Sequence, residues 1–143
     1  MAVARRFEEQ FQPSDFGIGQ LFDLIPDAVI VADALAGEIV LWNEAAEALF
    51  GYTSDEAHRL DIEHLMPAEY RPRHRAGLRR FARTGRGRLI DTRSTIAVRC
   101  LRSDGTQFDG EMRLAEIRSA PLGGVYVLAV VRATDPVAVV ASP

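Results

Sequence analysis

The sequence contains one cysteine, Cys100, and no lysine, and aromatic residues make up only 8 % of it. A single cysteine excludes an internal disulfide, so the fold must be held together by its hydrophobic core. The longest apolar run, from Val125 to Val131, has seven residues. A membrane-spanning helix takes about 20 consecutive apolar residues, so this run does not predict a transmembrane segment.

The first ten residues, MAVARRFEEQ, lack the apolar stretch of a secretory signal. Together with the single cysteine and the short apolar runs, this predicts a cytoplasmic protein with no membrane partner. The length of 143 residues and the hydrophobic fraction of 48 % are those of one globular domain with one sizeable core.

Charge is unevenly distributed along the chain. All 17 basic residues are arginine, and most of them lie between Arg71 and Arg102, whereas most of the 20 acidic residues precede Tyr70. Such asymmetry has two interpretations: a face for nucleic acid, or a solvated helix face balanced by the acidic half. We favour the second and expect no direct nucleic-acid partner, because no aromatic platform is interleaved with the arginines.

The first half of the chain predicts a helix, two strands and further short helices. Ser14 or Asp15 after Pro13 is a candidate N-cap for a helix through Ile25. β-Branched runs predict strands at 28–33 and 38–42. Asn43 then caps an Ala-rich helix that ends at Gly51, Thr53 and Glu56 form a capping box, and another short helix covers 62–66.

The second half begins with the longest helical pattern, Arg71 to Thr84, which Gly85 ends. From Leu89 onward the period changes to two, which predicts strands. The first of them carries Cys100, which we interpret as a small core residue. Ser103 to Thr106 forms a turn, and the strand that follows places Phe108, Met112 and Leu114 on one face. Three antiparallel strands therefore complete the chain.

The last strand, Val125 to Arg132, is apolar on both faces. A strand with one face in water alternates apolar and polar residues, so this strand must be central and covered on both sides. The helices can cover one face. The amphipathic N-terminal segment, with Phe7 and Phe11 four residues apart, or a second copy of the chain must cover the other. We therefore expect an α+β fold in which helices pack on one face of a five-stranded antiparallel sheet, and association through the other face.

Four segments carry a resemblance to the PAS family: IPDAVIVAD, EIVLWNEAAEALFGYTSDEA, LMPAEYRPRHRAGLRRFARTGRGRLI, and LRSDGTQFDGEMRLAEI leading to VYVLAVVRAT. The resemblance implies a PAS fold over residues 19–135, with an N-terminal helical cap and dimerisation segment at 1–18 and a tail at 136–143. PAS domains bind small ligands or dimerise to control a histidine kinase, a cyclic-nucleotide enzyme or a transcription regulator. The resemblance thus implies a bacterial signal-transduction input module that forms a homodimer through the outer sheet face and the N-terminal helix.

The third segment is also similar to the haem-binding PAS domains of rhizobial oxygen-sensing kinases. That similarity implies an axial histidine at His74, propionate-pairing arginines at Arg80 and Arg88, and an apolar distal wall of Leu89, Met112 and Leu114. The family's distal arginine falls at Ser94 or Ile96, depending on the direction of counting. The Arg-His-Arg helix also occurs in PAS domains without haem, so His74 has a purely structural alternative, and no metal is expected unless haem is bound.

Other cofactors and activities have less support. The flavin-binding PAS class needs a reactive cysteine in an Asn-Cys-Arg motif, which this chain lacks, so flavin is not expected. There is no P-loop, no G-x-S-x-G, no H-E-x-x-H and no G-x-G-x-x-G, so we expect no enzyme. The usual family ending before a linker helix is replaced by Arg132-Ala133-Thr134-Asp135 followed by Pro136. A small-molecule sensor, a ligand-free dimerisation module and a haem gas sensor remain as alternatives.

Overall fold

The structure is a computed structural model that describes residues 11–85, 95–119 and 123–134. Five strands form one antiparallel sheet in the order β2-β1-β5-β4-β3. The strands are β1 (Ala28–Asp33), β2 (Ile39–Trp42), β3 (Ile96–Leu101), β4 (Gln107–Ser119) and β5 (Gly124–Ala133). The expected α+β class and five-stranded sheet are confirmed, and β5 is central as its two apolar faces predict.

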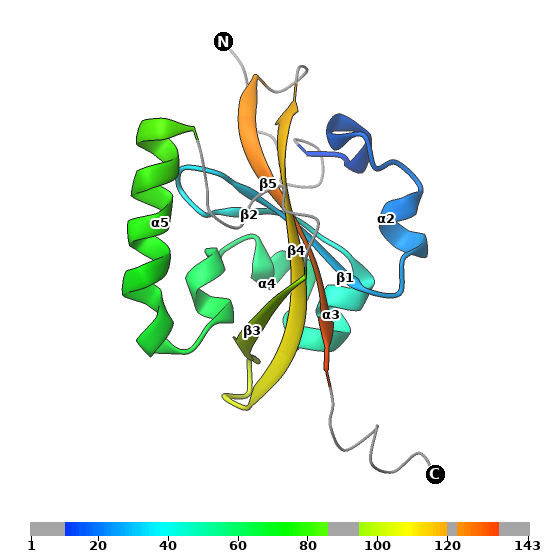
Figure 1. Cartoon of the computed structure of the whole chain (residues 1–143). Coiled ribbons are helices and arrows are strands. Elements are labelled where there is room, and N and C mark those ends of the chain that lie inside the picture. The colour runs from blue at the N-terminus through cyan, green and yellow to red at the C-terminus, as the bar shows by residue number, and fades with distance from the viewer. Residues whose placement is uncertain (1–10, 86–94, 120–122, 135–143) are drawn as a thin grey trace.

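Helices lie on both sides of this sheet (Figure 1). On the inner side are α3 (Glu44–Phe50), α4 (Ser54–Ala57), η2 (Ile62–Leu65), η3 (Ala68–Tyr70) and α5 (Arg71–Thr84). On the outer side are the short η1 (Pro13–Phe16) and α2 (Leu21–Leu24). Among the described residues, no helix is long and apolar enough to cross a membrane.

The prediction of one N-terminal helix through Ile25 is wrong, because the segment forms two separate short helices, η1 and α2. Gly17 adopts φ 75°, a left-handed conformation that ends η1. Gly19 also has a positive φ of 41°, so the chain turns again before α2. The second glycine, two residues after the first, is the sequence signal that predicts this interruption.

The inner face of the sheet carries one hydrophobic cluster. Its buried members come from the sheet and from the short helices α3, α4 and η2, among them Ile30, Trp42, Phe50 and Phe108. The Phe50 ring lies 5.4 Å from Trp42 and 5.5 Å from Phe108 between centroids. Aromatic pairs at this distance add stability beyond the area that they bury. This half of the inner face is therefore densely filled.

The outer face carries a second cluster, formed by the sheet and the N-terminal segment. Phe16 and Phe22 of η1 and α2 are buried against it, together with Val29, Val31 and Tyr126. The Phe16 ring meets Tyr126 edge-on at 4.9 Å. The N-terminal segment thus covers part of the outer face, whereas Leu128 and Val130 of β5 stay only partly buried.

Candidate functional site under helix α5

The two helices that frame the inner face are anchored differently. Asn43, the N-cap of α3, is 2 % exposed and satisfies all its side-chain hydrogen-bonding groups. Its Oδ1 accepts hydrogen bonds from the amides of Val29 and Ala46 at 2.9 Å, and its Nδ2 donates to the carbonyls of Phe22 and Asp27 at 3.1 Å. One buried side chain therefore ties α2, β1 and α3 together, whereas the sequence predicted only the cap.

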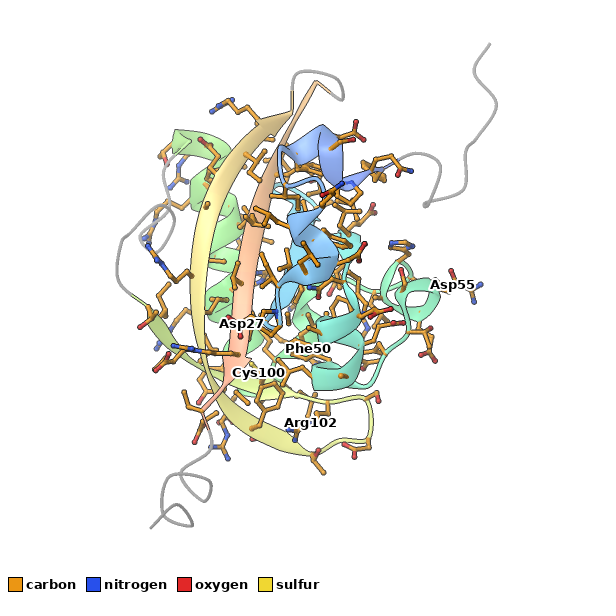
Figure 2. The ribbon with its side chains drawn as sticks, turned by 90° about the vertical axis from the view of Figure 1, so that its right-hand side faces the viewer. Asp27, Phe50, Asp55, Cys100 and Arg102 are labelled. Carbon is orange, nitrogen blue, oxygen red and sulfur yellow. The ribbon has the colours of Figure 1, made fainter. Side chains whose placement is uncertain are left out.

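The C-terminus of α3 is also fixed, by the turn between β3 and β4. Arg102 Nε donates to the carbonyl of Leu49 at 3.1 Å, and the Ser103 amide donates to that of Phe50 at 2.8 Å. The Arg102 guanidinium also lies 4.4 Å from the Phe108 ring centre, at cation–π distance. Figure 2 shows Arg102 and Phe50 close together at this end of the sheet. An arginine at a helix C-terminus also complements the helix dipole.

The Gly51 position that follows α3 favours glycine, because a side chain there would displace the Ser103 hydroxyl. Gly51 has φ 83°, and a Cβ atom there would lie 2.5 Å from Oγ of Ser103. Glycine therefore satisfies two requirements at once, the left-handed cap and the close approach of the hairpin turn.

Helix α5 has the boundaries that the sequence predicts, but it is attached mainly through its first turns. Arg71 Nε donates to the carbonyl of Glu63 at 3.0 Å, and Arg75 binds the Glu63 carboxylate with N–O distances of 2.8 to 3.1 Å. Further along, Phe81 is its one buried residue and Leu78 is half-buried. Among the described residues, the hydrogen bonds and ion pairs that tie α5 to other segments therefore go mainly to the short helix η2.

His74 lies within this anchor. Its Nδ1 is 3.5 Å from Oε2 of Glu63, which is close enough for attraction when the imidazole is protonated. The angles do not make a hydrogen bond, and Nδ1 is buried without a hydrogen-bond partner among the described residues. Glu63 is only 15 % exposed and is already held by Arg75. A carboxylate therefore lies near the His74 ring, and the Nδ1 atom of that ring makes no hydrogen bond to the described part of the chain.

The other residues of the predicted site are only partly described. Met112 and Leu114 are half-buried on β4 and pack against the inner cluster, as expected. Arg80 is exposed on α5. Arg88 and Leu89 lie outside the described residues, and so does Ser94. The structure therefore places an apolar wall on the inner face and His74 on the helix that adjoins it.

These described residues fit a haem in two respects. Nδ1 of His74 lies 3.5 Å from the Glu63 carboxylate, and metal-bound histidines commonly have such a carboxylate partner at the ring nitrogen that does not bind the metal, which would leave Nε2 as the ligand atom. Met112 and Leu114 provide the apolar surface that a porphyrin ring needs. If haem is bound, His74 would be its ligand. The iron would then supply the gas-binding position.

Cys100 is a core residue, as predicted. It is 6 % exposed and belongs to the inner cluster. Burial raises the pKa of its thiol to about 12, with a smaller raising effect from Asp109 and a lowering effect from Arg102. A thiol that stays protonated at neutral pH is a poor nucleophile, so Cys100 is not a reactive cofactor-binding residue.

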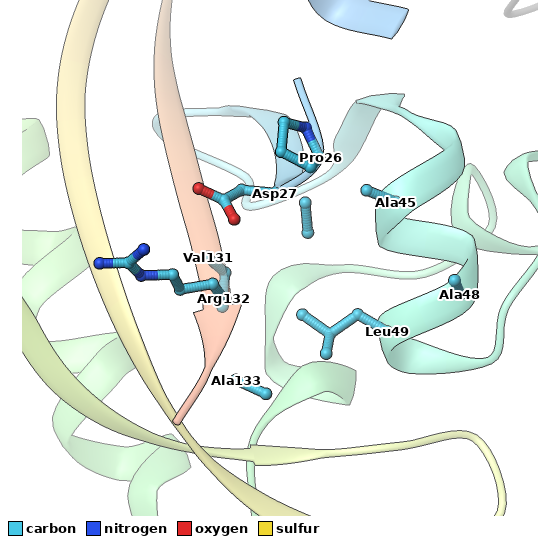
Figure 3. A pocket seen from close by; sticks show the side chains of 9 residues that line it. Pro26, Asp27, Ala45, Ala48, Leu49, Val131, Arg132 and Ala133 are labelled. Carbon is cyan, nitrogen blue, oxygen red and sulfur yellow. The ribbon is translucent and has the colours of Figure 1, made fainter. Parts of the chain in front are cut away.

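A pocket of about 300 Å³ lies away from His74, between α3 and the end of β5. Most of its lining is apolar: Pro26, Ala28, Ala45, Ala48, Leu49, Val131 and Ala133, with Asp27 and Arg132 as the polar members (Figure 3). In Figure 3 the side chains of Asp27 and Arg132 point to the same side, away from α3. Sequence analysis did not predict this pocket, because it forms only where three distant segments meet.

The PAS fold family matches residues 19–133. The match covers most of the chain and coincides with the sheet and helices described above. This chain therefore belongs to the PAS fold family, as the four sequence segments indicated.

Two curated relatives are similar to this chain in sequence. An uncharacterised protein of Azorhizobium caulinodans is 42 % identical over 100 residues, 69 % of this chain and 13 % of that protein. The sensor protein FixL of Bradyrhizobium diazoefficiens is 30 % identical over 115 residues, 80 % of this chain and 22 % of FixL. This chain therefore spans only a small part of each of these curated relatives.

A solved structure shows the same fold. The crystal structure of a PAS domain from Colwellia psychrerythraea superposes with a TM-score of 0.64 at 23 % identity, over 80 % of this chain and 92 % of that one. At this identity the likeness concerns the fold alone.

Proposed function

We propose that this chain is a sensory and regulatory PAS module of bacterial signal transduction that carries no catalysis of its own. In this proposal, a small ligand under α5 changes how that helix sits on the sheet, and an output kinase or regulator responds. The observation that supports it is the unequal anchoring of the two inner helices. Helix α3 is bonded at both ends, whereas α5 is attached through Arg71, His74 and Arg75 to η2.

This inequality suits a sensor for a physical reason. A ligand shifts a conformational equilibrium only if it binds two states with different affinity. A helix whose described bonds to other segments lie in its first turns can adopt a second position at the cost of few of those bonds, whereas α3 cannot move without leaving buried polar atoms unsatisfied. The apolar residues beside α5 then form the ligand-contacting wall, with Met112 and Leu114 on its sheet side.

Native mass spectrometry of the purified protein tests the ligand proposal, with two tryptophan variants of β4 as a pair. Leu114 faces the inner cluster, whereas the neighbouring Arg113 is exposed. We expect a co-purifying mass in the unchanged protein and in Arg113→Trp, and its loss in Leu114→Trp, because the larger ring fills the ligand space. No bound mass would favour a ligand-free interaction module, and equal retention in both variants would mean that the ligand does not lie against Leu114.

Haem is a specific second candidate for the ligand, supported by His74 and by the Glu63 carboxylate near its Nδ1. An absorption spectrum of protein expressed with haem precursor tests it. A Soret band that His74→Ala removes and Arg80→Ala leaves in place would identify His74 as the axial ligand. A spectrum without that band would leave His74 with its structural role beside Glu63.

Homodimerisation is the second part of the proposal. Leu21 and Leu24 of α2 are 58 % and 73 % exposed on the outer side of the sheet, where β5 also keeps Leu128 and Val130 partly uncovered. Apolar side chains gathered on one face favour association, and a twofold dimer buries the same face of both copies. The outer sheet face and the N-terminal segment are therefore the proposed interface.

Light scattering at several concentrations tests the dimer with a matched pair of substitutions. Leu24→Glu places a charge in the proposed interface, whereas Leu35→Glu changes a leucine that is 64 % exposed in the turn between β1 and β2. We expect a dimer for the unchanged chain and Leu35→Glu, and a monomer for Leu24→Glu. A monomer throughout would show that the N-terminal segment covers the face alone.

A further inference from the structure

Helix α5 is strongly basic in a chain that is acidic as a whole. Its sequence, RPRHRAGLRRFART, is rich in arginine and contains no acidic residue. The whole chain has a formal net charge of −3. The positive charge of α5 is therefore a local feature of one helix, not a consequence of a basic protein.

The arginines of α5 are concentrated on the side that faces away from the sheet. Phe81 is buried and Leu78 is half-buried, so these two residues mark the side that faces the rest of the molecule. Residues 73, 76, 80 and 83 follow another face of the helix, because they are three or four positions apart. The exposed arginines on this outward side are Arg73, Arg79, Arg80 and Arg83. Figure 1 shows α5 at the outer border of the molecule, with this side accessible.

The four outward arginines have no acidic partner within the described ranges. The ion pair of α5 with an arginine goes from Arg75 to Glu63, and Arg71 donates to the carbonyls of Glu63 and Met66. No hydrogen bond or ion pair joins the guanidinium groups of the outward four to any described residue. The balance between the basic and acidic halves is therefore limited, in the described structure, to the start of α5.

Like charges also lie above one another along this helix. Arg75 and Arg79 are four residues apart, and so are Arg79 and Arg83. Pairs of like charge at this spacing destabilise a helix. No acidic residue in the first turn offsets the positive end of the helix dipole. A partner rich in carboxylates would relieve both effects and would stabilise α5.

We propose that the outward face of α5, formed by Arg73, Arg79, Arg80 and Arg83, binds an acidic segment of a partner protein. The guanidinium group suits this role, because its planar fork binds a carboxylate through two parallel hydrogen bonds. The 14 residues of α5 give a face about 21 Å long. Glutamate or aspartate side chains three and four positions apart on a partner helix would follow the same face.

Two other anionic partners fit this face less well. A membrane-surface helix inserts its apolar side into lipid, whereas Phe81 and Leu78 of α5 are directed at the rest of the protein. A nucleic acid is a long polyanion, which the negative net charge of the chain repels. The outward face also has no aromatic side chain on which a base could stack. A short acidic protein segment meets the arginines without these costs.

This surface lies on the opposite side of α5 from the proposed ligand-contacting wall. Binding of the acidic segment therefore does not depend on whether a ligand is bound. One consequence rests on the proposed function: a partner held by α5 would respond when the ligand shifts this helix. Failure of the binding test below would leave the ligand proposal standing, because the two proposals concern different faces.

Fluorescence anisotropy with the full chain at low salt tests the proposal. The probe is a labelled helical peptide of about 14 residues, the length of α5, with glutamates three and four positions apart, and its control carries glutamine at those positions. The double variant Arg79→Gln with Arg83→Gln removes two charges from the outward face. The matched variant Arg99→Gln with Arg113→Gln removes two from exposed positions on the outer face of the sheet, away from α5. Circular dichroism checks that both variants fold.

We expect the glutamate peptide to bind the unchanged chain and the Arg99/Arg113 variant with similar affinity. Its binding to the Arg79/Arg83 variant should be about fivefold weaker or more, because two carboxylate contacts are lost. Added salt should weaken binding to the unchanged chain. No binding of the glutamate peptide, equal binding of the glutamine peptide, or equal weakening in both variants would overturn the proposal. Tighter binding of a DNA duplex or of anionic phospholipid vesicles would also overturn it, in favour of that partner.

Amide hydrogen exchange in the peptide complex locates the binding face independently. The amides of α5 should exchange more slowly when the glutamate peptide is bound, because the peptide relieves the repulsion between the arginines. The amides of α3 should keep their rates. Slower exchange confined to segments other than α5 would place the peptide elsewhere and would contradict the proposal.

Discussion

Helices α3 and α5 border the same sheet, yet within the described ranges α3 is bonded to other segments at both ends, whereas the bonds of α5 to other segments lie near its start. Phe50 of α3 is 1 % exposed and contacts two aromatic rings, and the N-cap Asn43 makes four hydrogen bonds. In α5, Phe81 is the one buried residue, and the ionic contacts lie near its start. The difference teaches that this fold combines a fixed half, which sets the geometry, with a half that has fewer bonds among the described residues and that the proposed ligand would shift.

The largest expected difference between the fixed half and α5 is in the rate of thiol labelling. Burial raises the pKa of Cys100 from 9.0 to about 12, so at pH 8 the folded protein holds roughly a thousandth of the thiolate of an unfolded chain. Cys100 should therefore react about a thousandfold more slowly than in urea. A cysteine at Leu78 on α5, placed in a Cys100→Ala background, should be slowed about tenfold or less. Similar protection at both positions would remove the distinction.

The raised pKa of the Cys100 thiol also fixes the direction in which the stability of the protein depends on pH. Because the pKa is higher in the folded state, the unfolded chain loses this proton first as pH rises above 9.0. The contribution of Cys100 to stability is therefore complete below pH 9 and is lost as pH approaches 12. Cys100→Ala should remove this part of the alkaline loss of stability, which urea titrations at pH 8 and pH 10 can measure.

Truncation of one phenylalanine in each helix compares their packing directly. Phe50→Ala should lower the free energy of unfolding by about 4 kcal/mol, because it leaves a cavity among Trp42 and Phe108. Phe81→Ala, on the helix with fewer attachments, should cost about half as much. Urea denaturation measures both, and an equal or larger loss for Phe81→Ala would show that α5 is as firmly packed as α3.

The buried cap of α3 is expected to contribute slightly less. Asn43→Ala should cost about 3 kcal/mol, because the amides of Val29 and Ala46 lose their acceptor inside the protein. Asn43→Asp keeps that acceptor but loses the donors to Phe22 and Asp27, so its loss should fall between those of the alanine variant and the unchanged chain. Both variants are checked by chemical denaturation. A loss below about 1 kcal/mol for Asn43→Ala would contradict the anchoring role of this network.

Two arginines provide the smallest and most closely matched comparison. Arg102→Ala should cost about 1 to 2 kcal/mol, because it removes the bond to Leu49 at the end of α3 and the contact with the Phe108 ring. Arg75→Ala removes an ion pair whose arginine is 57 % exposed, while Arg71 and His74 stay beside Glu63, so it should cost under about 1 kcal/mol. Thermal denaturation should rank them in this order, and the reverse order would mean that the start of α5 is the firmer anchor.

Much of this architecture could be predicted from the sequence because it is encoded locally. The period-two pattern gave the strands, and the two apolar faces of the last strand placed it at the sheet centre, where β5 lies. Helix α5 ends where Gly85 adopts φ 71°, as its glycine signal indicated. Thr53 and Glu56 form the expected capping box. The helix caps depend on residues that are neighbours in the sequence, and the residue types that form such caps are few.

Other features depend on contacts between distant segments, which a single sequence does not reveal. Arg102 reaches the carbonyl of Leu49 across 53 residues, and Asn43 meets Phe22 across 21. Sequence patterns identified Asn43 as a cap but not as the link between α2 and β1. The contact of His74 with Glu63 was missed because it requires η2 and α5 to fold against each other. The proposed haem site remains a prediction, since two of its residues, Arg88 and Leu89, lie outside the described residues.

Native-state hydrogen exchange of the backbone amides tests the central contrast most directly. The amides of α3, such as Glu47 and Gly51, should exchange only through global unfolding, with a free energy equal to that from urea denaturation. The amides of the last turns of α5 should exchange through local opening at a clearly lower free energy. Equal protection of the two helices would contradict the account, because α5 would then be as fixed as α3 and could not be the element that a ligand shifts.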